Sequence, residues 1–103
     1  EAGVIRNFRI DVDRRQLDCN ITGFILVAPE PDKYERFCRF CEKTPAILSH
    51  SHTIGIFNAV LRFAVRDTQE LDAILSSIKR YGNSQTSVEL GLYFDHKDIP
   101  LPG

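Results

Sequence analysis

Two cysteines and two histidines in the first half of the chain have the clearest chemical potential. Cys38 and Cys41 form a CxxC motif, and His50 and His52 extend it to C-x2-C-x8-H-x-H. Such a set can bind zinc, and a CxxC at the start of a helix can support redox chemistry. Here the cysteines fall within a predicted helix, on its apolar stripe, where cysteine behaves as a small hydrophobic residue. We therefore expect a core role for the cysteines and no metal or cofactor.

The histidine pair shares one face of a predicted strand. Solvent-exposed or interface histidines are commoner than metal ligands, so we favour that interpretation. A pH-sensitive interface is a further alternative, because histidine changes charge near neutral pH.

A second candidate site is the turn at the start of the segment Thr53–Asp67, TIGIFNAVLRFAVRD. Gly55 can adopt φ > 0 and so allows a sharp bend. Such a turn exposes backbone amides and carbonyls, which can hold a small polar ligand. The rest of the segment alternates apolar and polar residues with a period of two, which is typical of a strand, and its apolar content favours a central position in a sheet.

Other catalytic patterns are absent from the sequence. It contains no paired carboxylates, no Ser-His-Asp arrangement and no glycine-rich phosphate loop. Arg62 could meet a ligand carboxylate, but a neighbouring Glu89 is the expected partner. These absences favour a binding or assembly function over catalysis.

The composition describes one small domain. The chain has 103 residues, 43% of them hydrophobic, with a net charge of -1 and a pI near 6.3. This is enough apolar material for one core, and it provides no basic surface for nucleic acid. No apolar run has the length of a membrane span, and no signal peptide opens the chain. Three cysteines without a disulfide spacing favour the cytoplasm.

The chain begins at Glu1 and contains no methionine. We therefore expect a longer parent protein with a further N-terminal part.

Periodicity and turn signals predict six elements after an opening strand. Asp32 is the expected cap of the first helix, Asp67 and Glu70 form the expected capping box of the second, and Gly82 with Asn83 is its expected end. The elements are an opening strand Val4–Val12, then a strand Ile21–Ala28, a helix Lys33–Lys43, strands Ala46–Thr53 and Phe57–Arg66, a helix from Asp67, and a last strand Ser84–Asp95.

The order β-α-β-β-α-β predicts an α+β, ferredoxin-like fold. Two helices should cover one face of a four-stranded antiparallel sheet, with an N-terminal linker strand before it. Because the strands are apolar on more than one face, the uncovered face should be buried in a dimer that packs sheet on sheet, or in a larger ring.

With this topology, the chain resembles the C-terminal effector-binding (RAM) domain of Lrp/AsnC, or feast/famine, transcriptional regulators. The resemblance covers about residues 3–94 and depends on an ordered set of modest motifs rather than on one strong motif. The matching segments are Gly3-Val4-Ile5, Val12-Asp13, Thr22-Gly23-Phe24-Ile25-Leu26-Val27, Pro45, Gly55-Ile56-Phe57-Asn58, Arg66-Asp67 and Ser84-Gln85-Thr86-Ser87.

The resemblance implies a function and a site. Residues 1–20 would link to a helix-turn-helix domain that binds DNA, residues 21–95 would form the effector-binding and oligomerisation domain, and 96–103 an irregular tail. Such domains form dimers and often octamers, and they bind a free amino acid between dimers, which shifts their assembly. The implied effector-binding residues are Gly55, Ile56, Phe57 and Asn58, with Thr86 and Ser87 from a neighbouring chain.

The sequence departs from the family pattern at two positions of the Gly-x-aromatic-acidic turn. Ile56 and Asn58 stand where the family usually has acids, and carboxylates are the natural partners of an ammonium group. A different effector, a weaker one or none are the possible consequences.

Two alternatives to a regulator domain follow. One is a stand-alone metabolite-binding or assembly module without DNA binding. The other is part of an enzyme like the tetrapyrrole decarboxylases, for which His50, His52 and Arg62 are the candidate residues.

Overall fold

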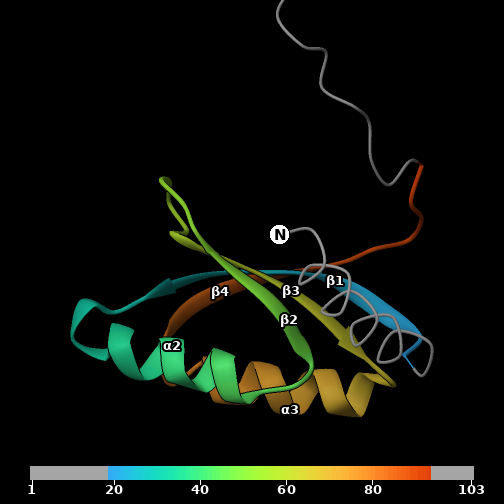
Figure 1. The fold of residues 1–103 in the computed structure, drawn as a ribbon, viewed down its shortest axis with the longest axis horizontal. Helices are drawn as coiled ribbons and strands as arrows, with labels where there is room; N and C mark the ends of the chain where they lie inside the picture. Colours follow the sequence, from blue (N-terminus) through green and yellow to red (C-terminus); the bar gives the residue numbers. More distant parts are fainter. Residues whose placement is uncertain (1–18, 94–103) are drawn as a thin grey trace, which may run out of the picture.

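The computed structural model describes residues 19–93, which form one four-stranded antiparallel sheet and two long helices (Figure 1). The strand order is β2-β3-β1-β4, with every neighbouring pair antiparallel. This is the predicted ferredoxin-like arrangement. The elements are β1 (Ile21–Pro29), η1 (Pro31–Lys33), α2 (Tyr34–Lys43), β2 (Ile47–His52), β3 (Ala59–Val65), α3 (Thr68–Ile78) and β4 (Gly82–Val88).

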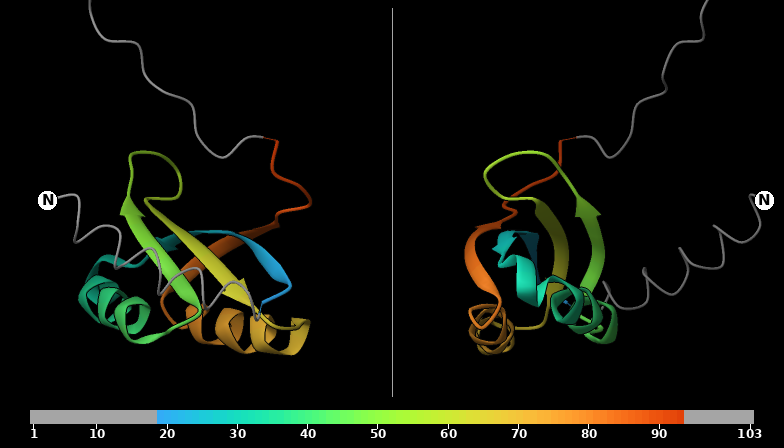
Figure 2. Two further views of the ribbon diagram at one scale, coloured as in Figure 1. Left: turned by 45° about the vertical axis from the view of Figure 1, so that its right-hand side comes forward. Right: turned by 90° about the vertical axis from the view of Figure 1, so that its left-hand side faces the viewer.

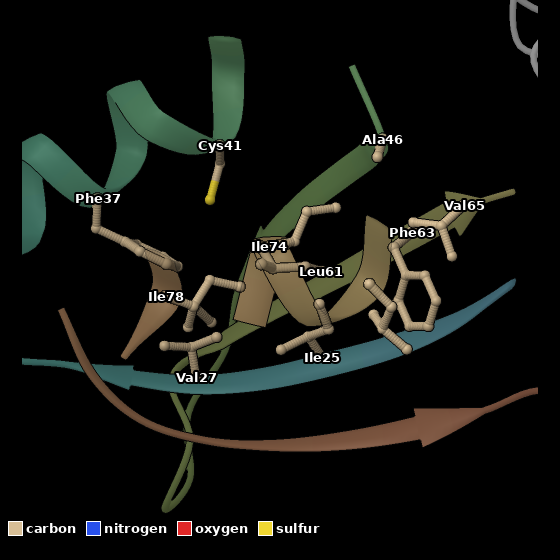
Figure 3. Close-up of a cluster of buried hydrophobic side chains, with 12 residues drawn as sticks. Ile25, Val27, Phe37, Cys41, Ala46, Leu61, Phe63, Val65, Ile74 and Ile78 are labelled. Carbon is tan, nitrogen blue, oxygen red and sulfur yellow. The ribbon is translucent and has the colours of Figure 1, made fainter. Parts of the chain in front are cut away.

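Both helices lie on the same face of the sheet, and the core fills the space between the two layers (Figures 1 and 2). The alternation of the central strands directs every second side chain toward the helices. Figure 3 shows this core between α2, α3 and the sheet. Its fully buried large side chains are Phe37, Phe63, Ile25, Leu61, Ile78, Val27 and Val65.

The first helix begins differently from the prediction. The expected cap by Asp32 is wrong: no side chain caps the first turn of α2. A 3-10 turn, Pro31–Lys33, comes first instead, and Lys33 is the N-cap residue of α2. Proline has no backbone N–H, so it suits this first turn, where such groups lack helical partners anyway.

The second helix begins as predicted. Asp67 accepts a hydrogen bond from the backbone N–H of Glu70 at 2.9 Å. The Glu70 carboxylate reaches back to the N–H of Arg66, also at 2.9 Å, which is one residue earlier than in the usual capping box. The apolar stripe of α3 is confirmed, since Leu71, Ile74 and Ile78 are buried.

The predicted end of that helix at Gly82 and Asn83 is wrong. The helix ends at Ile78, and both residues belong to β4, where they pair with Pro29 and Ala28. Gly82 is needed there because a Cβ atom would overlap the carbonyl oxygen of Ala28. Close approach of two backbones, rather than helix termination, therefore explains this glycine.

β2 does not have the predicted division of faces. Ile47 pairs with Phe63 but Ser49 pairs with Arg62, so Leu48 is an extra residue at an irregularity in the strand. One extra residue reverses the alternation beyond it. Regular alternation would place Ile47 with Ser49 and Ser51, on the face opposite the histidines, whereas in the structure Ile47 shares the helix-facing side with His50 and His52.

Two strands are shorter than predicted. β3 begins at Ala59 rather than Phe57, and β4 ends at Val88 rather than continuing to Asp95. In both cases the apolar alternation continues into residues that belong to no strand in the described part of the chain. The hydrophobic pattern alone therefore overestimates their length.

The uncovered face of the sheet is less apolar than expected. Phe24 is 40% exposed and Leu26 and Val60 are half-buried, so β1 is not buried on both faces within one chain. Polar residues flank this apolar stripe on both edge strands, notably Ser49, Ser51, Gln85 and Ser87.

The predicted linker strand Val4–Val12 and the irregular tail 96–103 lie outside the described residues. Within residues 19–93, neither helix has the length and apolar content needed to span a bilayer.

Candidate functional site

The β2–β3 turn, residues 53–58, projects from the end of the sheet. It extends beyond the sheet on the side away from the helices (Figures 1 and 2). Thr53 forms two hydrogen bonds across the turn. Its N–H donates to the Asn58 carbonyl at 2.9 Å, and its hydroxyl donates to the Phe57 carbonyl at 3.1 Å. Gly55 has φ of 155°, the only positive φ among the described residues. The predicted role of Gly55 in the bend is thus confirmed.

The turn presents apolar side chains to solvent. Ile54 is 104% exposed and Ile56 is 89% exposed, whereas Phe57 and Asn58 are half-buried at the base of the turn. Fully exposed isoleucine is unfavourable in water unless another molecule covers it. Sequence reasoning missed Ile54 and Thr53, although a threonine before a glycine turn was an available signal.

Thr86 and Ser87 lie on β4 and are not close to this turn within one chain. Thr86 pairs with Ile25, which pairs with Leu61, so two strand spacings of about 5 Å separate β4 from β3. Ile25 faces the helices, whereas Phe24, the partner of Ser87, faces the open side. The two candidate residues therefore point to opposite faces of the sheet.

The cysteines of the CxxC motif occupy the predicted core stripe of α2. Cys41 is 4% exposed, Cys38 is half-buried, and both are free thiols. Burial, followed by the nearby Cys38, raises the pKa of Cys41 to about 12. Cys41 is therefore a protonated thiol at neutral pH and a poor nucleophile.

The histidines face α2. The His50 ring lies edge-on to Phe37 with 5.3 Å between centroids, and His52 lies 5.7 Å from Tyr34. The Nε2 atom of His50 is buried without a hydrogen-bond partner. Burial, with a smaller effect of His52, lowers the pKa of His50, so the neutral imidazole is favoured.

Arg62 lies on the opposite face of the sheet from the histidines. Its guanidinium carbon is 5.7 Å from the centroid of the Phe24 ring. The expected contact of Arg62 with Glu89 is replaced by this cation–π contact, and Glu89 instead accepts a hydrogen bond from the Thr22 hydroxyl at 2.8 Å.

The candidate residues do not form a catalytic centre. His50 and His52 are separated from Arg62 by the thickness of the sheet, so the set suggested for an enzyme does not converge. Within residues 19–93, no three His, Cys, Asp or Glu side chains gather as a metal-binding group. The projecting turn can contact a ligand or a second chain, which suits binding rather than bond chemistry.

Comparison with known proteins agrees with this geometry. The profile of the Lrp/AsnC ligand binding domain matches residues 22–99. Over 104 aligned residues, the chain is 27% identical to HTH-type transcriptional regulator FL11 of Pyrococcus furiosus, covering 98% of this chain and 69% of that protein. This relative is a transcriptional regulator, not an enzyme.

Solved structures of the same fold include two longer transcriptional regulators. B. subtilis LrpC superposes with a TM-score of 0.73 at 17% identity, covering 82% of this chain and 59% of LrpC. The Neisseria meningitidis transcriptional regulator NMB0573, solved with L-Met, gives 0.72 at 19% identity, covering 82% of this chain and 58% of that one. The chain thus spans less than two thirds of either structure. It belongs to the Lrp/AsnC ligand binding domain family.

Proposed function

We propose that this domain senses a small-molecule effector and controls assembly in a cytoplasmic Lrp/AsnC-type transcriptional regulator. Residues 21–95 would form the sensing and oligomerisation domain, residues 1–20 would link it to a DNA-binding domain, and 96–103 would be an irregular tail. The match of residues 22–99 to the Lrp/AsnC ligand binding domain supports a sensing role for this part of the chain. The observation that carries the proposal is the β2–β3 turn, which projects two isoleucines that no other part of residues 19–93 covers.

The effector site would lie between subunits. Gly55, Ile56, Phe57 and Asn58 form one wall at the projecting turn, and Thr86 or Ser87 of a neighbouring chain would form another. The separation of β4 from the turn within one chain supports a contribution from a second chain. A ligand held between subunits stabilises the assembled state over the free one, which gives it control over assembly.

The exposed isoleucines favour an amino acid with an apolar side chain. Ile54 and Ile56 offer apolar surface, whereas the turn has no carboxylate to pair with an ammonium group. The solved complex of the NMB0573 regulator with L-Met, an amino acid with an apolar side chain, supports this choice. Because Asn58 brings no charge, we expect weaker binding than in relatives with an acid at this position.

The assembly itself would begin with a dimer that uses the open face of the sheet. The stripe of Phe24, Leu26 and Val60 would be covered by its counterpart in a second chain. A dimer is the minimum, and an octamer would bring the projecting turns of different dimers together.

A thermal melt with a panel of amino acids tests the effector part. A ligand at about 100 times its Kd stabilises a domain by about 2.7 kcal/mol. For a domain of this size that raises the melting temperature by roughly 11–22 °C. Apolar amino acids should raise it and acidic ones should not. If no amino acid changes the melting temperature or the sedimentation coefficient, the effector part is wrong.

Asn58→Asp sharpens this test. A carboxylate at position 58 would give the ligand ammonium a charged partner, which should tighten binding roughly fivefold to tenfold. Asp72→Asn changes an exposed acid on α3 and serves as a control, since it should leave affinity unchanged. If Asn58→Asp has no effect on an amino acid that binds, the ammonium group does not lie at this turn.

A further inference from the structure

The CxxC motif and His50 meet at a cavity that the effector site does not use. The cavity lies between α2 and β2 and has a volume of about 410 Å³. Cys38, Cys41 and Glu42 line it from the helix, and residues 47–50 line it from the strand. It therefore brings two free thiols to one concave surface at the edge of the sheet.

The helix fixes the spacing of the two thiols. Residues three positions apart on a helix have Cβ atoms about 5–6 Å apart on one face. Both cysteines are on the same side of α2, and neither forms a disulfide. Figure 3 shows the Cys41 sulfur directed from α2 toward the sheet. Two thiols at this spacing can approach one ion from two sides.

A third donor atom lies in the wall of the same cavity. The Nε2 atom of His50, a residue of the cavity wall, is the one buried side-chain nitrogen or oxygen without a hydrogen-bond partner among the described residues. This nitrogen is therefore free to accept a hydrogen bond within the cavity. The thiols and this imidazole nitrogen are all soft or borderline donors.

The number of donors restricts the kind of metal. Zinc in structural sites takes four protein ligands, and no group of three such side chains forms within residues 19–93. Magnesium and calcium require oxygen donors, of which only the Glu42 carboxylate is charged here. A soft d10 ion that accepts two thiolates is the remaining class.

We propose that Cys38 and Cys41 bind a soft d10 metal ion, with Cu(I) as the representative, between their two sulfur atoms at the wall of this cavity. Each thiol loses its proton and forms one metal–sulfur bond, so binding of one Cu(I) releases two protons and leaves the site with a charge of −1. No electron is transferred. The buried thiol is protonated in the free protein, so metal binding must displace this proton.

An anaerobic titration with Cu(I) in competition with the chromophoric chelator bicinchoninate tests the site. The protein should hold one Cu(I) per chain. Cys38→Ser should weaken binding at least tenfold while leaving the fold intact, because Cys38 is half-buried. Cys19→Ser, which changes a half-buried cysteine outside the cavity, is the matched control and should leave affinity within about twofold.

Two results would overturn the site: wild-type affinity in Cys38→Ser, or an equal loss of affinity in Cys19→Ser. X-ray absorption of the copper-loaded protein gives an independent readout. Two sulfur neighbours around copper are expected, and a shell of nitrogen and oxygen donors would contradict the proposal. X-ray absorption is measured on the wild-type protein, so the test requires no substitution of the buried Cys41.

Discussion

The imidazole of His50 meets the ring of Phe37 edge-on, with 5.3 Å between the ring centroids. This contact joins the edge strand β2 to the buried face of α2. It places an ionisable side chain within the aromatic packing between α2 and the sheet. The Phe37 ring also contacts Tyr81, at 5.7 Å, so the same packing reaches the segment between α3 and β4.

This contact makes stability depend on pH. Burial lowers the pKa of His50 below its ordinary value of 6.5, so below that pH the unfolded chain binds the proton before the folded protein does. The stability present above pH 6.5 is therefore lost as the pH falls through the folded-state pKa. Melting temperatures between pH 8 and pH 5 should show the loss, and His50→Phe should reduce it.

His52→Gln is the control for this prediction. His52 is exposed and is only the smaller cause of the shift in the pKa of His50. Most of the pH dependence should therefore remain in this variant. Equal pH dependence in wild type and His50→Phe would show that another group is responsible.

Gly23 allows β1 and β4 to approach each other. A Cβ atom there would overlap the carbonyl oxygen of Ser87 and lie 3.0 Å from the Phe63 ring, which is fully buried. Gly23→Ala should therefore cost about 1–3 kcal/mol in the free energy of unfolding, measured with urea. Gly91→Ala has no atom within 4 Å of the new methyl group and should be nearly neutral. Equal stability of the two variants would contradict the close approach.

Asp67 should contribute measurably to the stability of α3. Its side chain accepts the hydrogen bond from the Glu70 N–H that would otherwise lack a helical partner. Asp67→Ala should cost about 1 kcal/mol, which corresponds to a fall of roughly 4–8 °C in melting temperature. Asp67→Ser keeps an acceptor and should recover most of the loss. If serine and alanine are equally destabilising, the cap is not the reason.

Arg62 provides a test of the proposed dimer. It lies on the open face of the sheet over Phe24, so Arg62→Glu would place a carboxylate against an aromatic ring in the interface. Sedimentation should show a shift toward monomer, since an unpaired buried charge is strongly unfavourable. Arg39→Glu, at an exposed position of α2, should assemble normally. A dimer unaffected by Arg62→Glu would mean that chains associate through another surface.

The amino-acid sequence alone determined the order of the elements and most of the core. The alternation of apolar and polar residues predicted the buried face of β3, and the apolar stripes predicted those of the two helices. Both predictions succeed because side-chain direction follows from the helix and strand periods. The cap at Asp67 and the bend at Gly55 could also be predicted from the sequence, since each depends on residues close together in the chain. The resemblance to the Lrp/AsnC family rested on the same local order.

Features that depend on distant partners were decided only by the tertiary structure. An extra residue at Leu48 turned His50 toward Phe37, and nothing in the local pattern of β2 specifies that irregularity. The assignment of Gly82 to β4 follows from its close approach to Ala28, more than fifty positions earlier. The separation of Thr86 and Ser87 from the β2–β3 turn follows from the strand order β2-β3-β1-β4, which places β1 between β4 and β3. Local propensity cannot anticipate such contacts, because they arise from the packing of segments that are far apart in sequence.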